Sequence, residues 1–155
     1  MTMMMMPVVQ FSSLDDFVDE LWAGRFGCVR VWPAAWQRGQ GHVARVWRGV
    51  VCQAVLDDAW GRPHSVAMIS LALGSYEEVQ GRPFGPEEER RREVVEQWEK
   101  DGLLLVERWL VERLPAWARV ARGMVFTGLR GSEIQTAFEE GFEMIYAEVR
   151  GVKEA

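Results

Sequence analysis

Arginine and tryptophan recur at alternate positions in two segments near the start of the chain. Arg30 and Trp32 lie in the first segment, and Arg45 and Trp47 lie in the second. Alternate residues of a β-strand point to the same face of a sheet, so two antiparallel strands would bring these side chains together. Surfaces of this kind bind single-stranded nucleic acid, because cations follow the phosphates while aromatic rings stack on the bases.

Trp36 follows the first segment and adds a third indole. The sequence therefore predicts a nucleic-acid-binding surface made of Arg30, Trp32, Trp36, Arg45 and Trp47. The competing interpretation is that the tryptophans pack beneath a helix while the arginines extend to the edge of the sheet. The net charge of −5 also weighs against binding by bulk electrostatic attraction, since proteins that wrap duplex DNA are usually strongly basic.

A second candidate surface is a segment rich in tryptophan and leucine between residues 95 and 110. Its apolar residues exceed what one buried side of a helix needs, and residues 103–106 are apolar on nearly every side. We expect one side of this helix to pack on the core and another to contact a second copy of the chain. The predicted interface residues are Trp98, Leu105 and Trp109. The alternative is an internal helix covered by the other helices.

Other kinds of site have weaker support. The soft metal ligands Cys28, His42, Cys52 and His64 match no zinc-binding spacing, so we expect neither a metal nor a cofactor. The glycine-containing loop Thr127–Ser132 lacks phosphate-loop spacing, and a tight turn with a helix cap is the preferred interpretation. The sequence has no carboxylates spaced as an acid–base pair. A small hydrolase or nuclease with a carboxylate site built from distant residues is kept as the weaker alternative.

The composition is that of a soluble globular protein. A chain of 155 residues favours one domain, which we place at residues 11–155, with residues 1–10 as a flexible N-terminal tail. Two cysteines do not make a disulfide framework, and the apolar start lacks the pattern of an export signal. We therefore expect a cytoplasmic protein with no membrane partner.

A short helix, three strands and two further helices must position these residues. The helix over residues 14–22 begins after a serine cap, and the strands are expected at 27–32, 43–56 and 65–73. Residues 33–41 are expected to form a turn, because Pro33 stops the first strand. A long helix starts at Pro86, residues 115–123 fit either a helix or an edge strand, and a last helix follows Ser132. Its apolar stripe is Ile134, Phe138, Phe142, Ile145 and Val149.

These elements predict an α+β domain. Its sheet has three to four strands and is mainly antiparallel. The long helix and the C-terminal helix are expected to pack on one face of this sheet, and a short helix is expected at the N-terminus.

Overall fold

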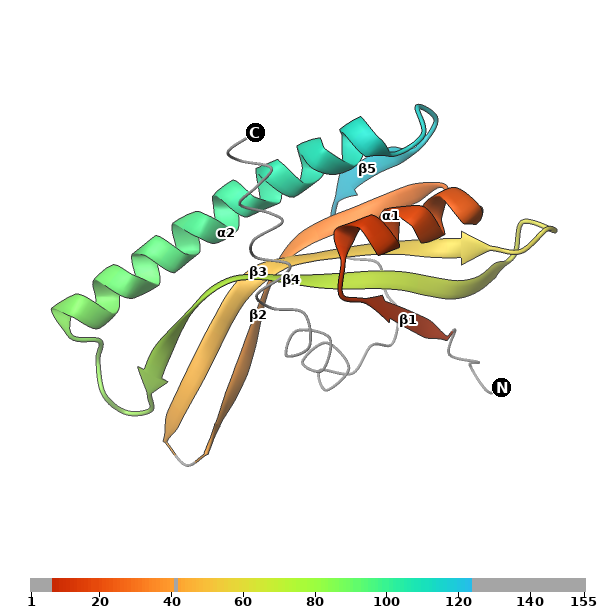
Figure 1. Cartoon of the computed structure of the whole chain (residues 1–155). Coiled ribbons are helices and arrows are strands. Elements are labelled where there is room, and N and C mark those ends of the chain that lie inside the picture. The colour runs from red at the N-terminus through yellow and green to blue at the C-terminus, as the bar shows by residue number, and fades with distance from the viewer. Residues whose placement is uncertain (1–6, 41, 124–155) are drawn as a thin grey trace.

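The computed structural model describes residues 7–40 and 42–123, which form one mixed sheet and two helices. In chain order the elements are β1 (Val8–Phe11), α1 (Leu14–Ala23), β2 (Cys28–Gln40), β3 (Val43–Asp57), β4 (Pro63–Val79), α2 (Pro86–Arg113) and β5 (Arg119–Arg122). The strand order across the sheet is β1-β4-β3-β2-β5. The three long strands β2, β3 and β4 are antiparallel neighbours, whereas β1 and β5 pair in parallel with β4 and β2 (Figure 1).

This sheet corrects the expectation of three to four mainly antiparallel strands. The α+β class is confirmed, but the sheet has five strands among the described residues and is mixed. The strand that was not predicted, β1, has only four residues, too few for a clear alternating pattern. Residues 8–10 of the expected N-terminal tail belong to β1, and β5 comes from the segment for which helix and strand were both open.

The expected turn at residues 33–41 is also wrong, because β2 continues through Pro33 to Gln40. Pro33 pairs with Val50 of β3 in the ladder. On its other side, β2 pairs with β5 only over Cys28–Val31, so Pro33 lies where the described part of β2 is an edge strand. An edge strand can lose one backbone donor without breaking a second ladder, which is why proline is tolerated there.

Both helices lie on the same face of the sheet (Figure 1). Ser13 caps α1 as predicted, with its hydroxyl accepting from the Asp16 N–H. Phe17 and Leu21 of α1 and Leu110 of α2 are buried against alternate residues of the long strands. The largest cluster of buried side chains among the described residues therefore lies between the helices and this one face.

Glycines let α2 approach the sheet closely. A Cβ atom at Gly102 would lie 2.1 Å from Leu73 Cδ1, and one at Gly74 would lie 2.8 Å from Trp98 Cε3. Glycine inside a helix costs about 1 kcal/mol relative to alanine. Here the absent side chain of Gly102 leaves room for the buried Leu73 side chain.

Several expectations fall outside the described residues. They include the loop Thr127–Ser132 and the C-terminal helix that was expected to pack beside the long helix. No helix of the described ranges has the length and apolarity needed to cross a membrane.

Candidate functional site

The five residues of the predicted nucleic-acid surface come from β2 and β3. Trp36 pairs directly with Trp47 in the ladder between these strands. Arg30 and Trp32 lie at alternate positions before Trp36, and Arg45 lies two residues before Trp47, so all five share one face. We call this surface the Arg/Trp face; it is the side of the sheet away from α1 and α2. The shared face is confirmed, although Trp36 lies in a strand and not in a turn.

The centre of the Arg/Trp face is apolar and buried. Trp36 is only 7% exposed, and it clusters with the buried side chains of Val51, Met68 and Ala72. Trp32 and Trp47 are partly buried against the same cluster. Neither α1 nor α2 contributes to this cluster, which is therefore separate from the main core. The broad face of the Trp36 indole is not open for stacking in this conformation.

The charge on this face is partly neutralised within the chain. Arg45 donates to the Ser75 hydroxyl at 2.9 Å and pairs with the Glu77 carboxylate at 3.3 Å. Both partners of this ion pair are well exposed, so the pair contributes little to stability. It does place a carboxylate beside the guanidinium that was expected to meet a phosphate.

Two polar side chains are buried at the centre of the Arg/Trp face. Gln53 pairs with Met68, and Ser70 pairs with Val51, in the ladder of β3 and β4. Both polar residues are fully buried, and within residues 7–40 and 42–123 Gln53 Oε1 and Ser70 Oγ have no hydrogen-bond partner. A buried polar atom without a partner costs about 1–3 kcal/mol. Sequence reasoning missed this pair, because each residue sits singly within an ordinary apolar strand.

The predicted interface residues lie mainly toward the core. Trp109 is 3% exposed and belongs to the core, while Trp98 packs in part against the sheet and Leu105 is partly buried. The outward side of α2 instead presents Leu104 and Val111, which are 56% and 64% exposed. The sequence pattern indicated an excess of apolar residues on this helix but not which of them face outward.

A shallow hollow of about 320 Å³ lies on the outward side of α2. Asp101, Leu104, Leu105 and Arg108 line it. The Asp101 carboxylate accepts from the Gln97 amide at 3.0 Å. Two leucines thus lie between one anionic and one cationic side chain on consecutive turns of the helix. We call these four residues the α2 hollow.

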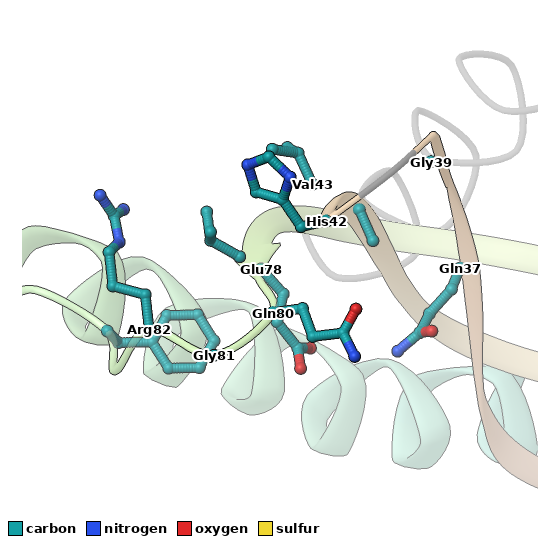
Figure 2. Close-up of a pocket in the computed structure, with 11 residues that line it drawn as sticks. Gln37, Gly39, His42, Val43, Glu78, Gln80, Gly81 and Arg82 are labelled. Carbon is teal, nitrogen blue, oxygen red and sulfur yellow. The ribbon is translucent and has the colours of Figure 1, made fainter.

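A polar pocket of about 680 Å³ lies at the tip of the β2–β3 hairpin, beside the loop that leads into α2. In Figure 2 the side chains of Gln37 and Gln80 point toward one another across it. Arg82 on its wall is paired with Glu88 at 2.8 Å. The lining residues are exposed or only partly buried and carry both signs of charge. They do not specify a ligand class.

Three exposed tryptophans lie toward one end of the molecule. Trp22, Trp60 and Trp117 are 58%, 81% and 62% exposed. The Trp22 indole N–H donates to the Arg113 carbonyl at 3.0 Å, and Trp117 packs on Phe26 with ring centroids 4.9 Å apart. The turn that carries Trp60 lies toward the same end (Figure 1). Sequence reasoning did not single out this group, because its members come from three distant segments.

Metal and thiol chemistry find no support in the described part of the chain. No group of three or more histidine, cysteine or acidic residues there is placed to hold a metal ion. Cys52 is fully buried, and burial raises the pKa of its thiol, so the reactive thiolate does not form at neutral pH.

Comparisons with protein-family models, with curated proteins and with solved structures found no match to this chain.

Proposed function

We propose that this chain is a non-enzymatic protein-interaction module that works as a homodimer through the outward side of α2. The observation that carries the proposal is the α2 hollow, where exposed Leu104 lies between Asp101 and Arg108. Exposed apolar side chains grouped on one helix side are typical of association surfaces. The arrangement of charges around them indicates a second copy as the partner.

The α2 hollow is complementary to itself under two-fold symmetry. If two copies of α2 cross in an antiparallel manner with the axis between positions 104 and 105, each Leu104 meets Leu105 of the partner subunit. Each Asp101 then meets Arg108 of the partner subunit, so the same ion pair forms twice. Leucine burial supplies most of the attraction, at about 1.5–3 kcal/mol per side chain. The two ion pairs fix the register and exclude the parallel arrangement.

Charge reversal tests this pairing. We expect the wild-type chain to sediment as a dimer at micromolar concentration. Asp101→Arg alone or Arg108→Asp alone should weaken the dimer about 10–100-fold, because two attractive pairs become repulsive. An equimolar mixture of the two variants should dimerise again, since every contact in the mixed dimer then joins opposite charges.

The matched control is Glu20→Arg, which makes the same kind of change at an exposed position of α1. It should leave the dimer unchanged. A wild-type chain that stays monomeric at micromolar concentration, or a mixture that fails to recover, would rule out the α2 hollow as the dimer interface.

The Arg/Trp face supports a second candidate function, binding of single-stranded nucleic acid. The supporting observation is the register that brings Trp32, Trp36 and Trp47 to one face with two arginines. Binding would need the partly buried indoles of Trp32 and Trp47 to become open, because stacking uses the face of the ring. This requirement makes the homodimer the better-supported function.

A fluorescently labelled single-stranded oligonucleotide tests the second function. If it is correct, binding weakens as salt increases, and Trp32→Ala/Trp47→Ala weakens it by at least tenfold, since each stacked base is worth about 1–3 kcal/mol. Trp60→Ala is the control, because Trp60 is exposed in a turn away from this face. Equal binding by the double variant and the control would contradict the hypothesis.

A further inference from the structure

The outer edge of β2 is open over most of its length. β5 pairs with β2 only over Cys28–Val31, and within residues 7–40 and 42–123 no other strand continues this pairing toward Gln40. An open strand edge presents backbone N–H and C=O groups, so a second extended chain can join the sheet by pairing with them. We call residues 33–39 the β2 edge.

The register of β2 determines which of its backbone groups face outward. The Val31 carbonyl accepts from the Gly123 N–H at 3.1 Å, so the backbone groups of Val31 point away from β3. These directions alternate along a strand, and the ladder between β2 and β3 continues to Gln40 without a shift. The residues of the β2 edge whose backbone groups face outward are therefore Pro33, Ala35, Gln37 and Gly39.

The position of Pro33 agrees with this register. Proline has no N–H, so it fits a position whose backbone faces away from the ladder with β3. The outward-facing residues of the β2 edge are all exposed, so a partner can reach their backbone groups. From Pro33 to Gly39 these groups extend over about 20 Å, which is the length of an ordinary strand.

The two sides of the β2 edge differ in polarity. On the Arg/Trp face, Trp32 and Ala34 are partly buried against the apolar cluster that contains Trp36. On the helix side, Gln37 and Gly39 line the polar pocket at the hairpin tip, and the Gln37 side chain projects into it (Figure 2). An added strand would place alternate side chains on these two sides. A segment with alternating apolar and polar residues therefore fits both.

We propose that the β2 edge binds an extended peptide segment of another protein, which joins the sheet as a strand of alternating apolar and polar residues. The backbone of β2 supplies the affinity, while the apolar row on one side and the polar pocket on the other select the segment. The β2 edge of a second copy fits less well, because Pro33 lacks a donor and Gly39 has no side chain to place in the pocket. The proposal does not depend on the homodimer, which uses the outward side of α2.

Amide hydrogen exchange, followed by NMR on the full chain, tests the site. The probe is a synthetic peptide whose core of alternating threonine and valine matches the β2 edge in length, with lysine at both ends for solubility. At millimolar peptide, exchange of the Ala35, Gln37 and Gly39 N–H groups should slow at least tenfold. Exchange of the Trp36 N–H, which faces β3, should not change. Unchanged exchange at the three outward amides would overturn the proposal.

Slow exchange at these three amides before the peptide is added would also overturn it. If the slow exchange depended on protein concentration, a second copy would occupy the β2 edge. If it did not, the edge would be covered within the chain.

N-methylation of the probe tests whether binding uses its backbone. One peptide carries methyl groups on the amides of its threonines, and the other carries them on the amides of its valines. Only one of these alternate sets can face β2, whichever direction the peptide runs. One peptide should therefore lose binding and the other should keep it. Equal affinity of the two peptides would contradict strand addition.

Gln37→Pro removes the central outward-facing donor and should weaken peptide binding at least tenfold. The ladder with β3 should persist, because this N–H faces the same way as the nitrogen of Pro33. The matched control, Gln37→Thr, keeps the N–H and should bind like the wild type. Both variants should sediment as the wild type does, which separates this site from the α2 hollow. Equal binding by the two folded variants would refute the proposal. If Gln37→Pro does not fold, the methylated peptides decide.

Discussion

Removing the guanidinium of Arg48 is expected to lower the free energy of unfolding by about 3 kcal/mol. Arg48 lies on the helix side of β3 and makes two hydrogen bonds to the Glu99 carboxylate of α2, at 2.9 and 3.0 Å. The Glu99 side chain is 9% exposed and that of Arg48 is 29% exposed. In Arg48→Met the carboxylate remains buried without its cation, and this unpaired charge is the main cost.

The partial exposure of Arg48 determines how much free energy of unfolding is lost when its guanidinium is removed. Breaking a fully buried ion pair costs about 3–5 kcal/mol, and partial access of water to one partner favours the lower end. The bidentate hydrogen bond to Glu99 raises the pKa of Arg48 above its ordinary value. A raised pKa means that the pair contributes its full stability below the ordinary arginine value, so this contribution persists across the neutral range.

Arg45→Met is the matched control, because Arg45 lies three positions earlier on β3 and pairs with the exposed Glu77. It should cost no more than about 1 kcal/mol. The double variant Arg48→Met/Glu99→Leu should recover most of the loss, since apolar side chains of similar volume can replace a buried pair. Urea unfolding followed by tryptophan fluorescence measures the free energy of unfolding of all three variants. Equal losses for Arg48→Met and Arg45→Met would contradict a buried pair.

The sequence contained a signal for this ion pair that pattern reasoning alone could not complete. Arg48 is the only charged residue on the otherwise apolar side of β3, so its position is anomalous in the alternating pattern. Its partner Glu99 lies 51 residues away on a helix, among several other acidic residues. Alternation identifies the face of a residue, but only the packing of α2 on the sheet selects which carboxylate meets it.

The candidate sites show the same difference between local patterns, which the sequence displays, and packing between distant segments, which it does not. Alternation correctly placed Arg30, Trp32, Arg45 and Trp47 on one face, because the strand period is local. Their exposure depends on which layer covers that face, and this is a property of the whole fold. Likewise, the apolar excess of α2 was visible, but the angle at which the helix packs decided that Trp109 is buried and Leu104 is exposed.

The short edge strand β1 was not predicted, and β5 was predicted only as an alternative to a helix, for an energetic reason. β1 and β5 have four residues each, and parallel pairing with β4 and β2 fixes them in the sheet. Such strands depend on a pre-existing sheet edge for their stability, because four residues are too few to form a stable strand alone, even in β1, where most of the residues favour strands. At Pro33 the error was the opposite, because a strand was predicted to end where β2 continues. Proline ends strands in most contexts, but it is tolerated here because β2 has no second neighbouring strand at this position.

Gly49→Ala is expected to lower the free energy of unfolding by at least about 3 kcal/mol, because the new methyl group would collide with backbone and not with a movable side chain. Gly49 lies at an irregularity of the β3–β4 ladder. A Cβ atom there would lie 1.9 Å from the Leu71 carbonyl oxygen and 3.0 Å from Ala72 Cα. Removing this collision requires the central strands β3 and β4 to separate. Their separation would disturb the ladder that holds both faces of the sheet in place.

Gly27→Ala is the control for this substitution. A Cβ at Gly27 meets no heavy atom within 4 Å, so alanine should be neutral or should stabilise the fold by about 0.4–1 kcal/mol by restricting the unfolded chain. Urea midpoints measured at one temperature compare the two variants. If Gly49→Ala unfolds at the same midpoint as Gly27→Ala, then β3 and β4 do not approach as closely at Gly49 as the ladder requires. In that case the irregularity does not fix the register of β3 against β4, in which Trp47 pairs with Ser75.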